Sequence, residues 1–253
     1  LLGERPTHPG LLDWLSVRLI RDGWSIKRLH RLIVLSRTYG LSSQVNAAAV
    51  QQDPDNRWLG RGRVRRIEAE AIRDALLAVG GQLDGTMTGS LLKLANRAYF
   101  FDHTSKDLTT YDSRRRSIYL PVVRNHVYDM FQLLDFPDPA VTTGDRTSTV
   151  VASQALMMLN SKVVMAAADG LARRLQSEAD GIDGRISRMY LVVYGRPPTA
   201  GERQADRRLL AELADGNGTP SRGGSVNEAE LPLAAWAGLC HVVLASNEFM
   251  YLR

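Results

Sequence analysis

Two carboxylates, Glu70 and Asp74, lie four residues apart in a segment whose apolar residues recur at helical spacing. On a helix this spacing places both side chains on one face, where like charges repel by a few tenths of a kcal/mol. A metal ion, a shared proton used in acid–base catalysis, or neighbouring arginines would each offset the repulsion. Because Arg66 and Arg73 both fall within helical reach of Glu70, the spacing favours an ion-pair network on a solvated face over a metal or acid–base pair.

Arginines flank an extended, β-branched segment in the middle of the chain. The candidate ligand-binding residues are Arg114, Arg115, Arg116, Arg124, Asn125 and Arg146. Guanidinium groups bind carboxylates and phosphates through paired hydrogen bonds, so this set could form an anion pocket. The alternative is structural, with the arginines donating to backbone carbonyls of an irregular segment. Acid–base work on a sugar by Glu70 or Asp74 would require two carboxylates roughly 5–10 Å apart in a cleft.

The sequence contains none of the short motifs that identify common catalytic or metal sites. The five histidines show no paired metal-ligand spacing, and His241 lies beside the only cysteine, Cys240, which favours a core histidine. A Walker loop, a nucleophile elbow and a dinucleotide fingerprint are all missing. So is the C-x-x-C-H motif of a c-type haem, and we therefore predict no metal and no cofactor in this chain.

Composition places the chain among globular proteins, with 253 residues of which 44% are hydrophobic. Of the 32 basic residues 28 are arginines, yet the formal net charge is only +5. We take this modest excess as spread along the chain, which argues against nucleic-acid binding, because a nucleic-acid footprint should be clustered. The longest apolar run, residues 231–245, is shorter than the roughly 20 residues that span a bilayer and predicts a buried helix.

Hydrophobic periodicity and capping signals predict a mostly helical chain. Helices are expected over residues 7–22, 25–39, 66–82, 127–134, 151–175 with a break near 160–161, 182–193, 199–213 and 231–245. A strand is expected near residues 99–101, and residues 117–125, interrupted by Pro121, predict an edge strand or an extended connector. The expected fold is all-α: one compact domain over residues 1–253, which allows two lobes, 1–145 and 146–253.

Several motifs, in order along the chain, resemble a known family. They include HRLIVLSRTYGLSS, DPDNRW, RRIEAEAIRDALLAV, RRRSIYLPVVRN, DFPDPAVTTGDRTST and QALMMLNS. This series is similar to the planctomycete domain of unknown function 1553 and covers nearly the whole chain. The family has no established catalytic residues, so the resemblance assigns none here.

The resemblance implies a context for the chain. Such domains form the C-terminal part of large secreted or periplasmic, cytochrome-c-associated proteins, so haem is expected only in a separate N-terminal domain. The expected function is a non-catalytic helical scaffold or docking domain of an extracytoplasmic multidomain protein, whose partners are other domains of the same polypeptide. The alternatives are a glycan- or anion-binding or hydrolytic domain linked to polysaccharide degradation and, less favoured, a nucleic-acid-binding domain. An exposed apolar patch of several hundred Å² would mark the partner surface.

Overall fold

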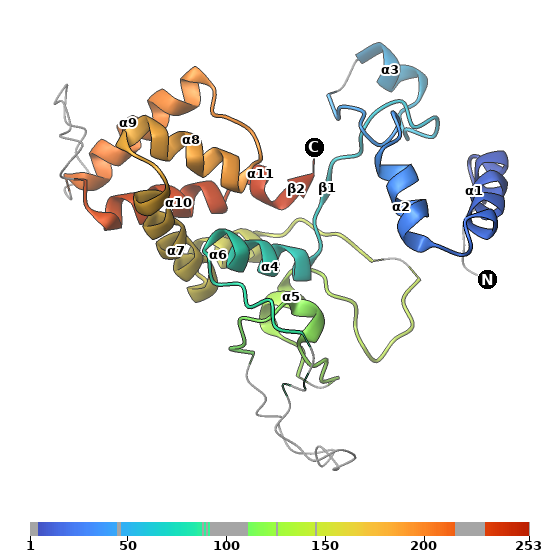
Figure 1. Cartoon of the computed structure of the whole chain (residues 1–253), viewed down its shortest axis with the longest axis horizontal. Helices are drawn as coiled ribbons and strands as arrows, with labels where there is room; N and C mark the ends of the chain where they lie inside the picture. The colour runs from blue at the N-terminus through green and yellow to red at the C-terminus, as the bar shows by residue number, and fades with distance from the viewer. Residues whose placement is uncertain are drawn as a thin grey trace. The chain divides into compact units, whose positions relative to one another are not determined.

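The computed structural model describes residues 5–44, 47–87, 89, 91, 111–124, 126–144, 146–215 and 231–252. Within these ranges the fold is all-α, as the sequence predicts, and the sheet found there pairs only two residues with two (Figure 1). In the same ranges no single helix is long and apolar enough to cross a membrane. Helices 152–160 and 162–178 reach that length and composition only as a pair bent by 48°.

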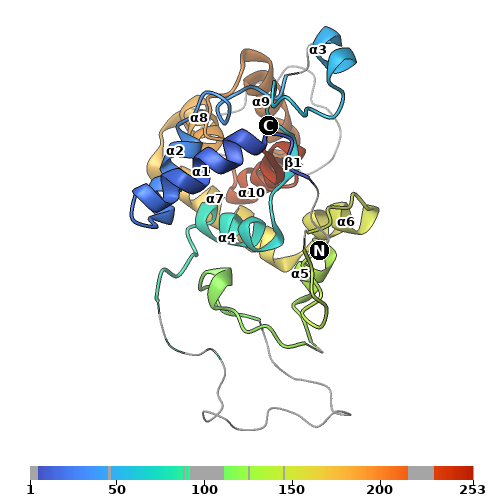
Figure 2. The ribbon, with the colours of Figure 1, turned by 90° about the vertical axis from the view of Figure 1, so that its right-hand side faces the viewer.

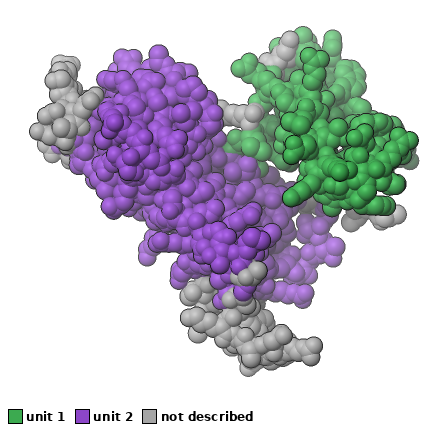
Figure 3. Space-filling view, in the orientation of Figure 1, with its two compact units in different colours: residues 1–66, 251–253 green, residues 67–250 purple. Residues whose placement is uncertain are grey.

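The chain divides into two compact units (Figure 3). Unit 1 comprises residues 1–66 and 251–253, and unit 2 comprises residues 67–250. Residue 145, where the sequence analysis placed the border between two lobes, lies outside the described residues, and that division stays a prediction.

Unit 1 consists of short elements with little packing between them. Its elements are α1 (Pro9–Arg21), α2 (Ile26–Val34), α3 (Ala47–Gln52), β1 (Arg65–Arg66) and β2 (Tyr251–Leu252). Helices α1 and α2 pack side by side as a hairpin (Figures 1 and 2). The two strands are antiparallel, so the C-terminal end of the described chain belongs to the same unit as its N-terminal part.

Local sequence signals explain the α1–α2 hairpin. Pro9 occupies the first turn of α1, where its missing N–H leaves no hydrogen bond unmade. Gly23 and Trp24 both have positive φ, 70° and 59°, and reverse the chain between the helices. Ser25 caps α2, its hydroxyl accepting a 3.4 Å hydrogen bond from the backbone N–H of Arg28.

Unit 2 is a packed assembly of helices around α7. Its elements are α4 (Ala69–Val79), the 3-10 turn η1 (Ser117–Tyr119), α5 (Asp129–Leu133), α6 (Ala152–Asn160), α7 (Lys162–Glu178), α8 (Gly181–Val193), α9 (Ala200–Ala214), α10 (Leu233–Leu244) and α11 (Asn247–Met250). Helix α7 packs against α4, α6, α8 and α10, and α9 packs against α8 and α10. The largest fully buried side chains include Leu171, Leu175, Ile186, Met189, Trp236 and Leu239. The prediction that residues 231–245 form a core helix is thus confirmed by α10.

Two predicted helix signals in unit 2 are confirmed. The break near residues 160–161 separates α6 from α7, and the hydroxyl of Ser161 caps α7 by accepting from the N–H of Val163. Thr199 and Glu202 form the expected capping box at the start of α9. The Glu202 carboxylate accepts a 2.7 Å hydrogen bond from the N–H of Thr199, and the Thr199 hydroxyl accepts one of 3.3 Å from the N–H of Glu202.

The segment predicted as an edge strand or extended connector contains no strand in its described residues. It begins with η1 and continues as irregular backbone through Pro121, so of the two alternatives the connector matches the structure. The strand expected near residues 99–101 lies outside the described residues.

Candidate functional site

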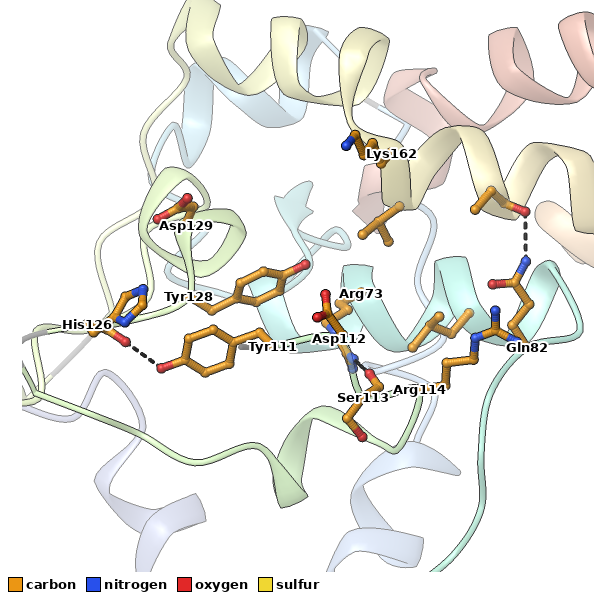
Figure 4. Close-up of a pocket in the computed structure, with 13 residues that line it drawn as sticks. Arg73, Gln82, Tyr111, Asp112, Ser113, Arg114, His126, Tyr128, Asp129 and Lys162 are labelled. Carbon is orange, nitrogen blue, oxygen red and sulfur yellow. Dashed lines mark hydrogen bonds between the residues drawn. The ribbon is translucent and has the colours of Figure 1, made fainter. Parts of the chain in front are cut away.

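A cavity of about 430 Å³ lies in unit 2 and collects side chains from four parts of the sequence (Figure 4). Helix α4 contributes Arg73 and Leu77, the segment before η1 contributes residues 111–114, the entry to α5 contributes His126, Tyr128 and Asp129, and the first turn of α7 contributes Lys162. The volume falls within the roughly 300–1,000 Å³ of small-molecule sites. The lining, however, contains more charged and polar groups than most such sites.

Stacked aromatic rings form one wall of the cavity. Tyr111 stacks on Tyr128 with ring centroids 5.1 Å apart and meets the ring of His126 edge-on at 5.8 Å. The Tyr111 hydroxyl donates to the backbone carbonyl of His126, which ties the two segments together. Burial raises the pKa of the Tyr128 phenol above its usual value. Tyr128 is therefore a neutral hydrogen-bonding group at physiological pH rather than a nucleophile.

Arg73 forms the floor of the cavity and is buried. Its guanidinium donates to the carbonyl of Arg115 at 2.9 Å, to the hydroxyl of Ser117 at 3.2 Å and to the carbonyl of Ser113. These bonds hold the irregular segment 113–117 against α4. The Arg73 guanidinium therefore positions the backbone of this segment, and few of its N–H groups remain to bind a ligand.

Four charged side chains at the rim have no ion-pair or hydrogen-bond partner in the described part of the chain: Asp112, Arg114, Asp129 and Lys162. All four are exposed to solvent, so leaving them without partners costs little. Together they offer hydrogen-bond donors and acceptors to a polar ligand. They do not include a nucleophile held by a base, the arrangement that covalent catalysis requires.

Glu70 and Asp74 both lie on α4, but their carboxylates bind different partners. Glu70 accepts two hydrogen bonds from Arg146, at 2.9 and 3.0 Å, and this pairing raises the pKa of Arg146 further above its usual range. Asp74 accepts from the backbone N–H and the hydroxyl of Ser117, at 2.8 and 2.6 Å. Each carboxylate thus ties an irregular segment to α4, and each has a partner of its own.

The predicted arginine set does not converge on one place. Arg115 is buried and donates to the carbonyls of Thr86 and Gly89, whereas Arg114 lies at the rim of the cavity. Arg116 and Arg124 are exposed, and Asn125 lies outside the described residues. Arg146 lies at a second hollow, lined mainly by described residues between 136 and 144, with its guanidinium 5.6 Å from the ring centroid of Phe136.

The helical spacing predicted Arg73 only as a partner for Glu70, and the role of Arg73 in the cavity floor was not predicted. A signal was available, because Arg73 falls on the same helix face as Ala69, Ile72 and Leu76, all of them buried. A charged residue on an apolar face indicates a buried group with designated partners. The side chains of Tyr128 and Lys162 carried no such signal, because their neighbours come from distant parts of the sequence.

Cys240 and His241 lie in the core helix α10. Burial raises the pKa of the Cys240 thiol to about 12, so the thiolate is not accessible at physiological pH. The imidazole of His241 hydrogen-bonds the carbonyl of Met158 at 3.0 Å. Among the described residues no group of three or more His, Cys, Asp or Glu side chains could hold a metal ion.

A second candidate surface is the α1–α2 hairpin of unit 1. Neither helix has a buried residue, and large apolar side chains on both are exposed. Leu12 is 52% exposed, Ile20 56% and Trp24, in the turn between the helices, 70%. Among the described residues of unit 1, no apolar side chain is buried. These exposed apolar side chains on two neighbouring helices make the hairpin a candidate interaction surface.

A protein-family model matches the chain, whereas comparisons with curated proteins and with solved structures give no match. The matching family model is described as PSD1, protein of unknown function (DUF1553), and it covers residues 1–210. Those residues include the α1–α2 hairpin, the cavity and the Glu70–Arg146 pair. Because the match covers most of the 253 residues, the chain belongs to the PSD1 (DUF1553) family of proteins of unknown function.

Proposed function

We propose that this chain is a helical docking domain, and that its α1–α2 hairpin binds the surface of another protein domain. The observation that carries the proposal is that no apolar side chain of unit 1 is buried among its described residues. Two helices of 13 and nine residues are marginal in water without tertiary packing. A partner that covers their apolar side chains supplies the missing packing.

The cavity of unit 2 supports a ligand-binding function less well. Arg73 is engaged by backbone carbonyls, and the charged groups at the rim are exposed and therefore solvated. Neither Glu70 nor Asp74 lines the cavity, and both have protein partners. The exposed apolar side chains of the hairpin, by contrast, are not packed within unit 1, and a bound partner would account for them.

The proposal sets the domain in an extracytoplasmic, cytochrome-c-associated polypeptide, in which any haem belongs to another domain. Its support is the resemblance of the motifs at residues 114–125, 135–149 and 154–161. In this setting the partner of the hairpin is another domain of the same polypeptide.

Site-specific photo-cross-linking tests the docking function in cells that produce the protein from its own gene. A benzoylphenylalanine at position 12, 20 or 24 replaces an exposed apolar residue of the hairpin, and one at Leu191 replaces an apolar residue of unit 2 that is 48% exposed. We expect cross-links to a protein surface from the three hairpin positions at several times the yield from position 191. Equal yields from all four positions would contradict a docking role for the hairpin.

A further inference from the structure

The distribution of charge gives unit 1 a second property. Residues 5–44 contain seven Arg and Lys residues against two Asp residues, a net charge of +5, which equals the formal charge of the whole chain. The rest of the sequence therefore has equal numbers of acidic and basic residues. The hairpin itself, residues 9–34, contains five basic residues against two acidic ones, so it is locally more basic than the chain as a whole.

The basic residues of α2 lie on one side of the helix. At 3.6 residues per turn, Lys27, Arg28 and Arg31 project within about 100° of one another, on the side of α2 away from Ile26 and Ile33. None of the three forms an ion pair in the described part of the chain, and all three are exposed. Helix α2 therefore has a positive face, and the helix itself contains no acidic residue.

Helix α1 has a different pattern from that of a surface helix. Its exposed apolar residues are Leu11, Leu12, Trp14, Val17 and Ile20. On a helical wheel these five leave no empty sector wider than about 100°. Polar residues of α1 such as Asp13, Arg18 and Arg21 lie between these apolar ones, so the helix has no wholly polar face. A helix with apolar residues on several sides is normally enclosed by protein, whereas a helix lying on a lipid surface needs one polar face.

We infer that the partner of the hairpin is a protein surface with an apolar groove that encloses α1 and a rim of acidic residues that faces Lys27, Arg28 and Arg31. This inference rests on the proposed docking function and adds the chemistry of the partner. A second copy of the chain is disfavoured, because two hairpins with five basic residues against two acidic ones each, a net charge of +3, repel each other. A lipid surface is disfavoured because it would cover only one side of α1.

The test uses two synthetic amphipathic helical peptides with the same leucine face, one flanked by glutamates and the other by lysines. The whole chain with Trp58→Phe reports binding, since of the remaining tryptophans Trp14 and Trp24 are exposed while Trp236 is fully buried. Covering the indoles should shift their fluorescence to shorter wavelength. We expect the glutamate peptide to bind about tenfold more tightly than the lysine peptide at low salt, with the preference fading at high salt.

Charge reversal supplies the matched control. In the triple variant Lys27→Glu, Arg28→Glu, Arg31→Glu, whose three sites are exposed, we expect the preference to switch to the lysine peptide. Far-UV circular dichroism and the thermal midpoint should stay unchanged, because no core residue is altered.

Four results would overturn the inference. These are equal affinity for both peptides, no binding of either, tighter binding to vesicles of phosphatidylglycerol than to the glutamate peptide, and concentration-dependent dimerisation of the free chain. Any of them, together with positive photo-cross-linking from positions 12, 20 and 24, would leave the docking function standing and remove the partner surface with an apolar groove and an acidic rim. A failure of docking itself would appear instead as the loss of those cross-links.

Discussion

At the scale of single residues, charged side chains in unit 2 mainly hold irregular backbone in place. Arg73 binds the segment 113–117, Arg115 binds carbonyls at Thr86 and Gly89, and Arg146 is held by Glu70. Local spacing predicted correctly that Glu70 and Asp74 share a helix. It could not identify Arg146, which lies 76 residues away, because no short-range pattern encodes a contact made by an irregular segment.

We expect Arg73→Lys to lower the free energy of unfolding by about 2–3 kcal/mol. An ammonium group cannot reproduce the planar fork that reaches the carbonyls of Ser113 and Arg115 together, so buried acceptors lose their donor. The control Arg116→Lys alters an exposed arginine of the same segment and should change stability by less than about 0.5 kcal/mol. Urea denaturation followed by circular dichroism measures both; a similar effect of the two substitutions would show that the buried fork has no special role.

At the scale of the elements, the sequence predicted correctly those helix boundaries that depend on local hydrogen bonds. The capping box at Thr199 and the break at Ser161 each depend on hydrogen bonds within three residues, and both are present. The packing of α4 on α7 depends instead on two glycines 90 positions apart. A Cβ on Gly170 would overlap the carbonyl oxygen of Gly80, and a Cβ on Gly80 would lie 2.9 Å from Cα of Ala167. No local pattern in the sequence predicts this contact, because its two glycines are far apart along the chain.

The close approach of α4 and α7 predicts that Gly170→Ala is destabilising, although alanine is the better helix former. Its methyl group has only backbone to displace, so the helices must separate, at a cost of about 1–3 kcal/mol or more. Gly201→Ala in α9 is the control, because nothing lies within 4 Å of its Cβ, and it should stabilise by up to about 1 kcal/mol. Thermal unfolding of both variants measures these changes in stability. A stabilising effect of Gly170→Ala would contradict the close approach of α4 and α7.

At the scale of the whole molecule, core and charge are divided between the units. The buried apolar residues among those described all belong to unit 2, and the excess positive charge lies in residues 5–44, within unit 1. Composition placed the chain among globular proteins, but a composition of the whole chain averages over this division. The hydrophobic stripes of α1 and α2 look in sequence like those of α7 and α8, because periodicity indicates which residues need burial and not whether the same chain provides it.

Amide hydrogen exchange on the whole free chain should separate the two units by their local stability. Amides in the interior of α7 and α10 open only when the core of unit 2 unfolds, since these helices contain fully buried residues such as Leu171 and Trp236. Amides of α1 and α2 are protected only by a hairpin without buried side chains, and helices of this length open readily in water. We expect protection factors in α1 and α2 to be at least about 100-fold lower than in α10.

Saturating amounts of the glutamate-flanked peptide should raise protection in the hairpin and leave α7 and α10 unchanged, because binding stabilises only the element that it covers. Equal protection of α1 and α10 in the free chain would mean that the hairpin is already covered, and would remove the reason for seeking a partner.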